Sequence, residues 1–268
     1  MGHFAETYFK RFSAYEKQID SLPDKDLFLS IVIPAFNEPD LCSSLEAIVN
    51  CDEPRQSVEV IVVINASEDS PEDILRINRK SYEDAVQFSK ENSSPKLQFK
   101  ILHFDNLPKK FAGVGTARKI GMDEALRRFG SLNKPDGLIA GFDADAKIDK
   151  NYLKEIECYF KNHPHTNGCS IHFEHPIEGS EFDDQIYERI INYELHLRYL
   201  NEAMRFANFP FAYHTIGSGF VVKAEVYAKQ GGMNRKKAGE DFYFLHKLSN
   251  QTMELSANRK VGLKCPEW

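Results

Sequence analysis

Short apolar runs alternate with amphipathic stretches along roughly the first 160 residues of the chain. The runs at 29–33 and 58–64 are dominated by Leu, Ile and Val, which is typical of strands buried on both faces. Two further runs, 97–104 and 137–142, also predict strands. Helices are expected where apolar residues recur every three or four positions, namely at 40–50, 72–92, 115–129 and 148–162.

Strands that alternate with helices predict β-α-β units, and therefore an α/β fold with a doubly wound, mostly parallel sheet. Pro34 should end the first strand, because proline lacks the N–H group that a strand ladder needs. In such sheets a ligand binds outside the carboxyl ends of the strands. Asn37, Asn65 and Asp143 each follow a predicted strand, so we expect their loops to converge on one crevice.

The second half of the chain has a less regular pattern. Residues 167–173 predict a strand, and apolar residues at helical spacing predict a long helix over 183–206. The stretch 209–222 is aromatic and interrupted by glycine, and 240–248 predicts a short helix. No internal boundary is visible in the 268 residues, so we expect one domain over 1–268.

Composition narrows the class of protein. Lys and Arg total 34 against 40 Asp and Glu, and this net charge of −6 argues against a broad nucleic-acid-binding surface. The 5 cysteines are scattered without a C-x-x-C pair, which favours reduced thiols in a reducing compartment. Because neither a signal peptide nor a transmembrane segment is predicted, we expect a cytoplasmic protein. Peripheral contact with a membrane surface stays open.

The sharpest chemical signal is a pair of carboxylates, Asp143 and Asp145, directly after the predicted strand 137–142. Carboxylates spaced i, i+2 at a turn can approach one site, and Mg²⁺ and Mn²⁺ favour such oxygen ligands. Magnesium usually completes its coordination shell with water and phosphate oxygens. The pair therefore predicts a site for one divalent cation.

Several blocks of sequence resemble the family-2 glycosyltransferases. They lie in the order found in that family and span roughly residues 28 to 248. The blocks are 31–38 (IVIPAFNE), 113–121 (GVGTARKIG), 142–145 (FDAD), and the pair 231–233 (GGM) and 239–241 (GED).

This resemblance implies a GT-A fold, an inverting transfer from a nucleotide-diphosphate sugar, and Mg²⁺ or Mn²⁺ on Asp143 and Asp145. The nucleotide-sugar half would cover about 28–150, and the half that binds a saccharide or other hydroxyl acceptor about 151–268. The expected nucleotide-sugar residues are Pro34, Ala35, Asn37, Glu38, Asn65, Arg118 and Asp143. The chain departs from the family at Asn65, where an acidic residue is usual, and this leaves the choice of base open.

Asp241 and Glu240 are the candidate catalytic carboxylates, and the family position favours Asp241 as the base that deprotonates the acceptor. The alternative is a structural role, because acidic residues in a first helical turn interact well with free N–H groups and the helix dipole. Arg118 and Lys119 suit a phosphate-facing helix start, with a solvated helix face as the alternative.

Two other functions compete with sugar transfer. A sugar-1-phosphate nucleotidyltransferase has a similar sheet but typically carries a Gly-rich, basic signature near the first strand, which residues 34–38 lack. A catalytically silent GT-A module that binds a nucleotide sugar or a protein partner is the second alternative. Two features favour this hypothesis: Asn65 replaces the acidic residue that is usual in the family, and the sequence after the helix at 240–248 is short.

Histidines and aromatic residues of the second half give weaker signals. His172 and His175 could face the acceptor, whereas His214 is expected to be structural. An aromatic cluster is expected to pack in the core rather than to stack on a sugar; its members are Phe206, Phe209, Phe211 and Tyr213.

Overall fold

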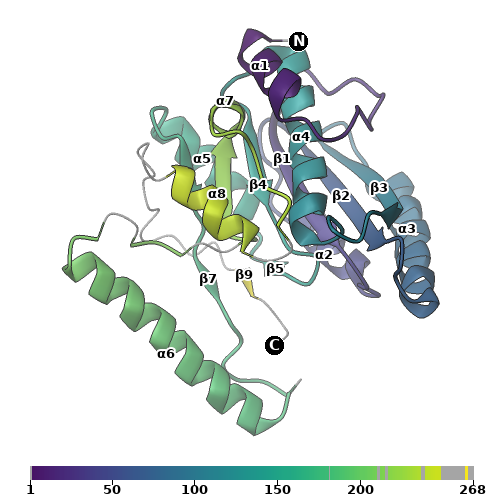
Figure 1. Ribbon diagram of the computed structural model, residues 1–268. Helices are drawn as coiled ribbons and strands as arrows, with labels where there is room; N and C mark the ends of the chain where they lie inside the picture. Colours follow the sequence, from purple (N-terminus) through teal and green to yellow (C-terminus); the bar gives the residue numbers. More distant parts are fainter. Residues whose placement is uncertain are drawn as a thin grey trace.

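The computed structural model describes residues 2–180, 182–209, 212–214, 217–236 and 239–248, and the backbone of 263–264. A six-stranded sheet with the order β3-β2-β1-β4-β8-β6 forms its centre (Figure 1). The strands are β1 (Leu27–Ala35), β2 (Ser57–Ser67), β3 (Leu97–Leu107), β4 (Leu138–Gly141), β6 (Gly168–Ser170) and β8 (Phe220–Lys223). The first four are mutually parallel, and β8 runs antiparallel to β4 and β6. The expected α/β fold with a mostly parallel sheet is confirmed.

The prediction that Pro34 ends the first strand is wrong. Pro34 lies inside β1 and pairs with Val63 of β2, whereas pairing with β4 stops at Val32 and Gly141. The carbonyl of Val32 accepts a hydrogen bond from the N–H of Phe142, so alternate residues of β1 direct their backbone groups toward β4. Pro34 is the next residue on that side, where β4 has ended, and its missing N–H costs no ladder bond.

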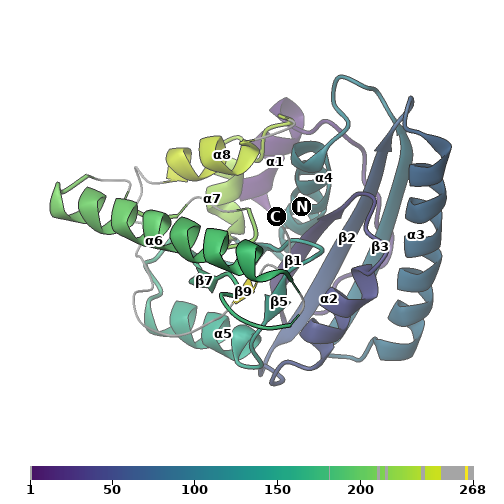
Figure 2. The same cartoon turned by 90° about the horizontal axis from the view of Figure 1, so that it is seen from below.

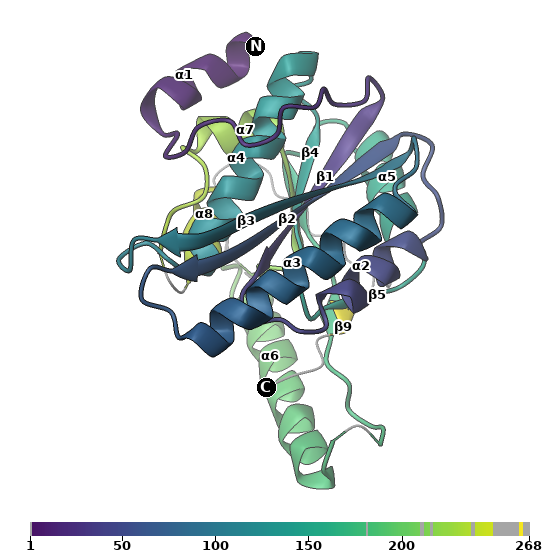
Figure 3. The ribbon, with the colours of Figure 1, turned by 90° about the vertical axis from the view of Figure 1, so that its right-hand side faces the viewer.

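Helices cover both faces of the sheet. Ile31 and Ile33 of β1 face the core beneath α2 (Leu41–Val49), α3 (Glu72–Asn92) and α5 (Tyr152–Asn162). Val32 faces the opposite core, which is covered mainly by α4 (Val114–Leu132). Three further helices pack on the α4 side, namely α1 (His3–Arg11), α7 (Ala224–Lys229) and α8 (Glu240–Leu248) (Figure 3). Because both faces of the central strands are buried, their sequences read as continuous apolar runs.

The structure corrects several predicted boundaries. The helix expected over 148–162 begins only at Tyr152, because 147–148 form strand β5 (Lys147–Ile148). The strand expected over 167–173 is divided into β6 and β7 (Phe173–Glu174). Strand β9 (Leu263–Lys264) lies between β5 and β7 in a small second sheet. Helices α1 and α7 were not expected from the sequence.

Helix α6 (Asp184–Phe206) lies apart from the two helical layers, as Figures 1 and 2 show. It begins at the predicted place, where the side chain of Asp183 caps it by accepting a 2.8 Å hydrogen bond from the N–H of Gln185. In the part of the chain that the structure describes, no helix combines the length and apolar character needed to cross a membrane.

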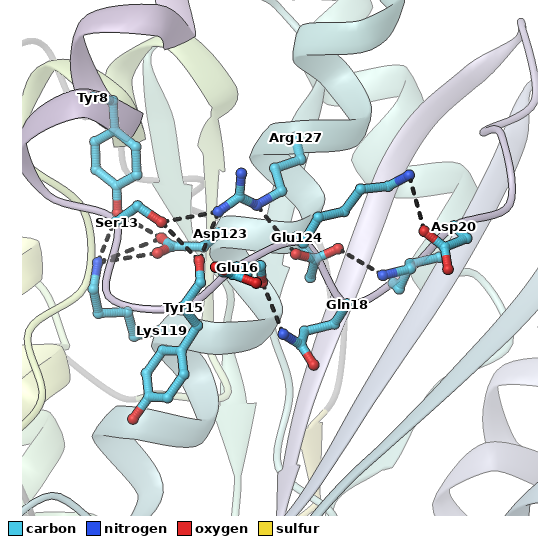
Figure 4. A network of polar contacts seen from close by, with 12 residues as sticks. Tyr8, Ser13, Tyr15, Glu16, Gln18, Asp20, Lys119, Asp123, Glu124 and Arg127 are labelled. Carbon is cyan, nitrogen blue, oxygen red and sulfur yellow. Dashed lines mark hydrogen bonds and ion pairs between the residues drawn. The ribbon is translucent and has the colours of Figure 1, made fainter.

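A buried polar network attaches the N-terminal segment to α4 (Figure 4). Asp123 of α4 accepts hydrogen bonds from the hydroxyls of Tyr8 (2.5 Å) and Tyr227 (2.8 Å). Lys119 lies one turn earlier, donates to the Tyr8 hydroxyl (2.8 Å) and forms an ion pair with Asp123 (3.2 Å). Burial raises the pKa of Asp123 and lowers that of Lys119, because desolvation disfavours both charges. The two charges are tolerated here because they neutralise each other.

Replacement of Asp123 tests how much this network contributes to stability. Asp123→Leu should lower the free energy of unfolding by about 3–5 kcal/mol, because it leaves the Lys119 ammonium buried without its counter-ion. Urea unfolding followed by circular dichroism measures the change. Asp20→Asn, on an almost fully exposed side chain, is the control and should not move the midpoint. A loss below about 1 kcal/mol for Asp123→Leu would contradict this interpretation.

Candidate functional site

Polar residues from the ends of β1 and β2 meet beside the start of α4. The N–H of Asn37 donates to Oδ1 of Asn78 (2.8 Å), and Nδ2 of Asn78 donates to the carbonyl of Asn65 (3.2 Å). Nδ2 of Asn65 in turn donates to the carbonyl of Gly113, the N-cap residue of α4 (3.2 Å). These bonds join two strand ends to the helices on opposite faces of the sheet. The predicted convergence of Asn37 and Asn65 is therefore present.

Asn65 retains an unused acceptor. The residue is 1% exposed, and among the described residues its Oδ1 has no hydrogen-bond partner. A buried amide oxygen without a donor costs free energy unless a ligand or a water satisfies it. Because Nδ2 is held by Gly113, the free oxygen presents a fixed acceptor for an N–H group.

Arg118 connects the start of α4 to two other parts of the site. Its guanidinium forms ion pairs with Asp143, just after β4, and with Glu240, the first residue of α8. The Arg118 side chain is 4% exposed and that of Glu240 is 3% exposed. Gly217 lies against the guanidinium, and a Cβ there would come within 2.2 Å of it. A larger residue at this point would have to displace the guanidinium from its ion pairs.

The carboxylates around Arg118 differ in their accessibility. Burial raises the pKa of Glu240, and this effect is opposed by Arg118 and reinforced by Asp241 and Asp143. Asp241 is only half-buried, and its Oδ1 accepts a hydrogen bond from the N–H of Phe242 (2.7 Å). Asp241 is thus the more accessible of the two candidate bases, whereas Glu240 is engaged with Arg118.

The other predicted residues occupy the same edge of the sheet in different environments. Pro34 and Ala35 are buried at the end of β1, and the half-buried Glu38 follows, with its carbonyl accepting a hydrogen bond from Ser81 (2.7 Å). Asp145 is exposed, two residues beyond Asp143. In the described residues, no group of three or more His, Cys, Asp and Glu side chains could hold a metal ion.

Lys119 does not belong to this site. The alternative prediction, that Arg118 and Lys119 lie on a solvated face of the helix, is wrong for both residues. Lys119 is 5% exposed and points to Tyr8 and Asp123, whereas Arg118 is 4% exposed and points to Asp143 and Glu240. Neighbours in a helix are about 100° apart, so two consecutive cations serve two separate networks.

Asn78 and Gly217 were not identified from the sequence. Asn78 has a readable signal, because Asn78, Ser81 and Ala85 are the buried residues of α3 and recur at i, i+3 and i+7. A polar residue on that buried row needs a hydrogen-bond partner, which indicates a network. Gly217 has no such signal, since its role depends on a guanidinium 99 positions earlier in the chain.

Two histidines of the second half have structural partners. Nδ1 of the His175 ring lies 2.5 Å from a carboxylate oxygen of Glu194 in α6. The backbone N–H of His175 donates a hydrogen bond to the same oxygen (2.9 Å). His214 contacts Nδ2 of Asn201 (3.4 Å) and the ring of Phe173 (5.2 Å between centroids). The structural role expected for His214 agrees with these contacts.

The aromatic cluster does not pack together in the core. Phe206 is 92% exposed and Phe209 is 46% exposed, whereas Tyr213 is buried. Phe211, the fourth member of the predicted cluster, lies outside the described residues.

Comparison with known proteins identifies the family. The model of "Glycosyl transferase family 2" matches residues 30–229, which is most of the chain. The chain belongs to glycosyl transferase family 2. The family match includes most of the residues assembled here around α4, but ends before Glu240 and Asp241.

Relatives match parts of longer proteins. A 59-residue stretch is 44% identical to a poly(ribitol-phosphate) beta-glucosyltransferase of Bacillus spizizenii, which is 22% of this chain and 9% of that protein. S. aureus TarS, residues 1–349, matches with a TM-score of 0.58 and 16% identity over 90% of this chain and 60% of that one. A mannosyltransferase from Pyrobaculum calidifontis, solved with GDP-Man and Mn²⁺, matches with a TM-score of 0.50 and 18% identity over 97% of this chain and 61% of that one.

These likenesses show the fold, which is GT-A as expected. TarS has also been solved with UDP-GlcNAc, and that structure matches with a TM-score of 0.56 and 15% identity over 90% of this chain and 59% of that one. The chain thus spans about 60% of the length of the TarS fragment that it matches.

The environment of His214 predicts a pH dependence of stability. Burial, assisted by the charge of Arg198, lowers the pKa of His214 to about 4, whereas an unfolded histidine titrates near 6.5. Between these values the unfolded state binds more protons, so the free energy of unfolding should fall as the pH decreases from about 6.5 to 4. Urea unfolding at several pH values measures this slope.

His214→Gln should reduce that slope relative to the parent, because the variant lacks the titrating ring. The control is His3→Gln, whose side chain is 98% exposed and which should leave the profile unchanged. A profile for His214→Gln that coincides with the parental one would show that other groups cause the pH dependence.

Proposed function

We propose that the chain transfers a sugar from a nucleotide-diphosphate sugar to an acceptor hydroxyl. The observation that carries this proposal is the arrangement around the start of α4, in a chain of glycosyl transferase family 2. There, an amide oxygen of Asn65 without a partner among the described residues lies at the end of β2, and Arg118 joins Asp143 to Glu240. Such an edge offers an acceptor for a base and a cation for a diphosphate.

In this proposal the nucleotide lies along the carboxyl ends of β1 and β2. Asn65 Oδ1 accepts a hydrogen bond from an N–H of the base or a hydroxyl of the ribose, while Pro34, Ala35, Asn37 and Glu38 line the pocket. Without a negative charge at Asn65, selection among bases depends on hydrogen-bond geometry alone. Uridine and guanosine nucleotides each have an N–H group from which this oxygen could accept a hydrogen bond. Sugar donors with either nucleotide therefore belong in a first screen.

The carboxylates present fit a divalent cation of the Mg²⁺ or Mn²⁺ type. Asp143 and Asp145 supply hard oxygen ligands, and these cations usually complete their shell with water and phosphate oxygens rather than with further side chains. A site with only two carboxylates from the protein, Asp143 and Asp145, is therefore compatible with a bound Mg²⁺ or Mn²⁺. When bound, the cation would neutralise the negative charge that develops on the leaving diphosphate.

Asp241 is the proposed general base. It takes the proton of the acceptor hydroxyl while that oxygen forms a bond to the anomeric carbon of the donor. The bond from the anomeric carbon to the phosphate oxygen breaks, and the nucleoside diphosphate leaves with the electron pair. Attack on the face opposite the leaving group inverts the configuration. The acceptor is a saccharide or another hydroxyl compound, and Glu240 holds Arg118 in place.

Calorimetric titration with UDP- and GDP-sugars, with and without Mn²⁺, tests the donor site. Asp143→Asn and Asp145→Asn should each abolish the gain in nucleotide affinity on adding Mn²⁺. Asp145→Asn, at an exposed side chain, should change the unfolding free energy by no more than about 1–2 kcal/mol, whereas Asp143→Asn should cost more because it removes one counter-ion of the buried Arg118. Asp26→Asn, an exposed residue before β1 at the opposite edge of the sheet, is the control and should keep the gain. A metal-dependent affinity that survives in both site variants would refute the assignment.

Replacing the two acidic residues of α8 separates the base from its neighbour. Asp241→Asn should keep donor affinity and fold but lower the transfer rate by at least about 100-fold, because a positioned base typically contributes that much. Glu240→Gln should instead weaken donor binding, because it releases Arg118. If Asp241→Asn transfers sugar at the parental rate, Asp241 is not the base and has only a structural role at the start of the helix. Donor binding without any transfer by the parent would favour the catalytically silent module.

A further inference from the structure

The side of helix α3 that faces the sheet is polar where it reaches the candidate site. Its buried residues are Asn78, Ser81 and Ala85, whereas apolar neighbours such as Tyr82 and Phe88 are half-buried. A helix that covers a sheet usually buries aliphatic side chains, since these need no hydrogen-bond partners. The first half of α3 instead brings an amide and a hydroxyl to the carboxyl ends of β1 and β2 (Figure 3). These two polar side chains indicate a role beyond packing.

Both ends of the Asn78 amide bond to the backbone of the candidate site. Oδ1 accepts a hydrogen bond from the N–H of Asn37 (2.8 Å), and Nδ2 donates one to the carbonyl of Asn65 (3.2 Å). Asn78 is 1% exposed, so the two bonds are shielded from water. One turn further along, the hydroxyl of Ser81 donates to the carbonyl of Glu38 (2.7 Å). Helix α3 therefore fixes the loop after β1 and the end of β2 together.

The two backbone segments that Asn78 joins are irregular. Asn37 has a left-handed conformation with a φ of 55°, which is uncommon for residues other than glycine. The pairing of β2 with β3 shifts register between Asn65 and Ser67, so the end of β2 departs from a regular ladder. Regular secondary structure by itself therefore fixes neither segment. The hydrogen bonds to α3 supply that constraint.

We infer that Asn78 is a positioning residue for the base and ribose of the donor, a role that rests on the proposed function. The Asn65 carbonyl is held by Asn78, and the Asn65 Nδ2 is held by the carbonyl of Gly113. The Oδ1 atom of Asn65, which has no partner among the described residues, is thereby directed to one place. The same Asn78 amide holds Asn37, and so sets how the two parts of the proposed nucleotide pocket lie relative to each other. A pocket formed in advance binds more tightly, because the donor does not have to order it.

General stabilisation of the fold is the alternative role for Asn78, and it makes a different prediction. A destabilised fold would weaken binding of the base, the ribose and the diphosphate alike. Positioning of Asn37 and Asn65 affects the base and the ribose, whereas the proposed partners of the diphosphate are Arg118 and a divalent cation. Pyrophosphate with Mn²⁺ lacks a base and a ribose, and therefore distinguishes the two roles.

Calorimetric titration of Asn78→Ala with UDP, GDP and pyrophosphate, each with Mn²⁺, tests the inference. Affinity for whichever nucleotide the parent binds should fall by about tenfold, because the Asn65 acceptor is no longer held in place. Affinity for pyrophosphate should stay at the parental value. The matched control is Asn92→Ala on the same helix, whose Nδ2 donates to the carbonyl of Phe88 one turn earlier (3.0 Å), and which should change neither affinity. Circular dichroism and thermal melting establish that both variants are folded.

A double-mutant cycle tests whether Asn78 acts through Asn65. In an Asn65→Ala chain, Asn78→Ala should lower nucleotide affinity by no more than about twofold, since the acceptor that it positions is absent. Asn78→Ser, too short to reach both backbone groups, is a second variant with the same expectations. Unchanged nucleotide affinity, an equal loss in both backgrounds, or an equal loss for pyrophosphate would overturn the inference. A parent that binds neither nucleotide would overturn it together with the proposed function, whereas nucleotide binding without sugar transfer would contradict the proposed function alone.

Discussion

The ion pairs of Arg118 with Asp143 and Glu240 hold the candidate site together. A buried guanidinium is costly unless its charge is neutralised, and this one is enclosed at the junction of three separate elements. The start of α4, the loop after β4 and the start of α8 must all be in place before the charge is balanced. Gly217 contributes a fourth constraint, since any larger residue would displace the guanidinium. The fold thereby collects at one point the chemical groups that lie far apart in the sequence.

This arrangement also determines what a donor would encounter. On the proposed function, the diphosphate brings negative charge to a site where Arg118 is the buried cation and Asp143, Glu240 and Asp241 are nearby carboxylates. Arg118 can exchange a carboxylate for a phosphate oxygen without leaving its position, because a guanidinium offers several N–H donors in one plane. Its Nε has no hydrogen-bond partner among the described residues, so one donor is already unused. A cation on Asp143 would compensate the carboxylate that Arg118 releases.

The first half of the fold could be predicted because each strand and helix has its own local signal. The runs at 29–33 and 58–64 correspond to β1 and β2, and 72–92 coincides with α3. Prediction failed where long-range packing decides the structure. Helix α1 has a weak signal by itself and depends on contacts of Tyr8 with Asp123 and Tyr227. Likewise, the site residues Arg118 and Asp143 followed from motifs, whereas their pairing with each other and with Glu240 requires the assembled fold.

The two faces of α4 link the stability of the molecule to its candidate chemistry. Arg118 faces the site, and the next residue, Lys119, faces the network that holds α1. Because a helix moves as a rigid element, a disturbance at Asp123 or Tyr8 would shift the guanidinium as well as loosen the N-terminal segment. Gly115 tightens this dependence, since a Cβ there would lie 2.1 Å from the carbonyl of Lys236 in the loop that leads to α8. We therefore expect the N-terminal segment to help position the site through α4, the helix that carries the buried cation.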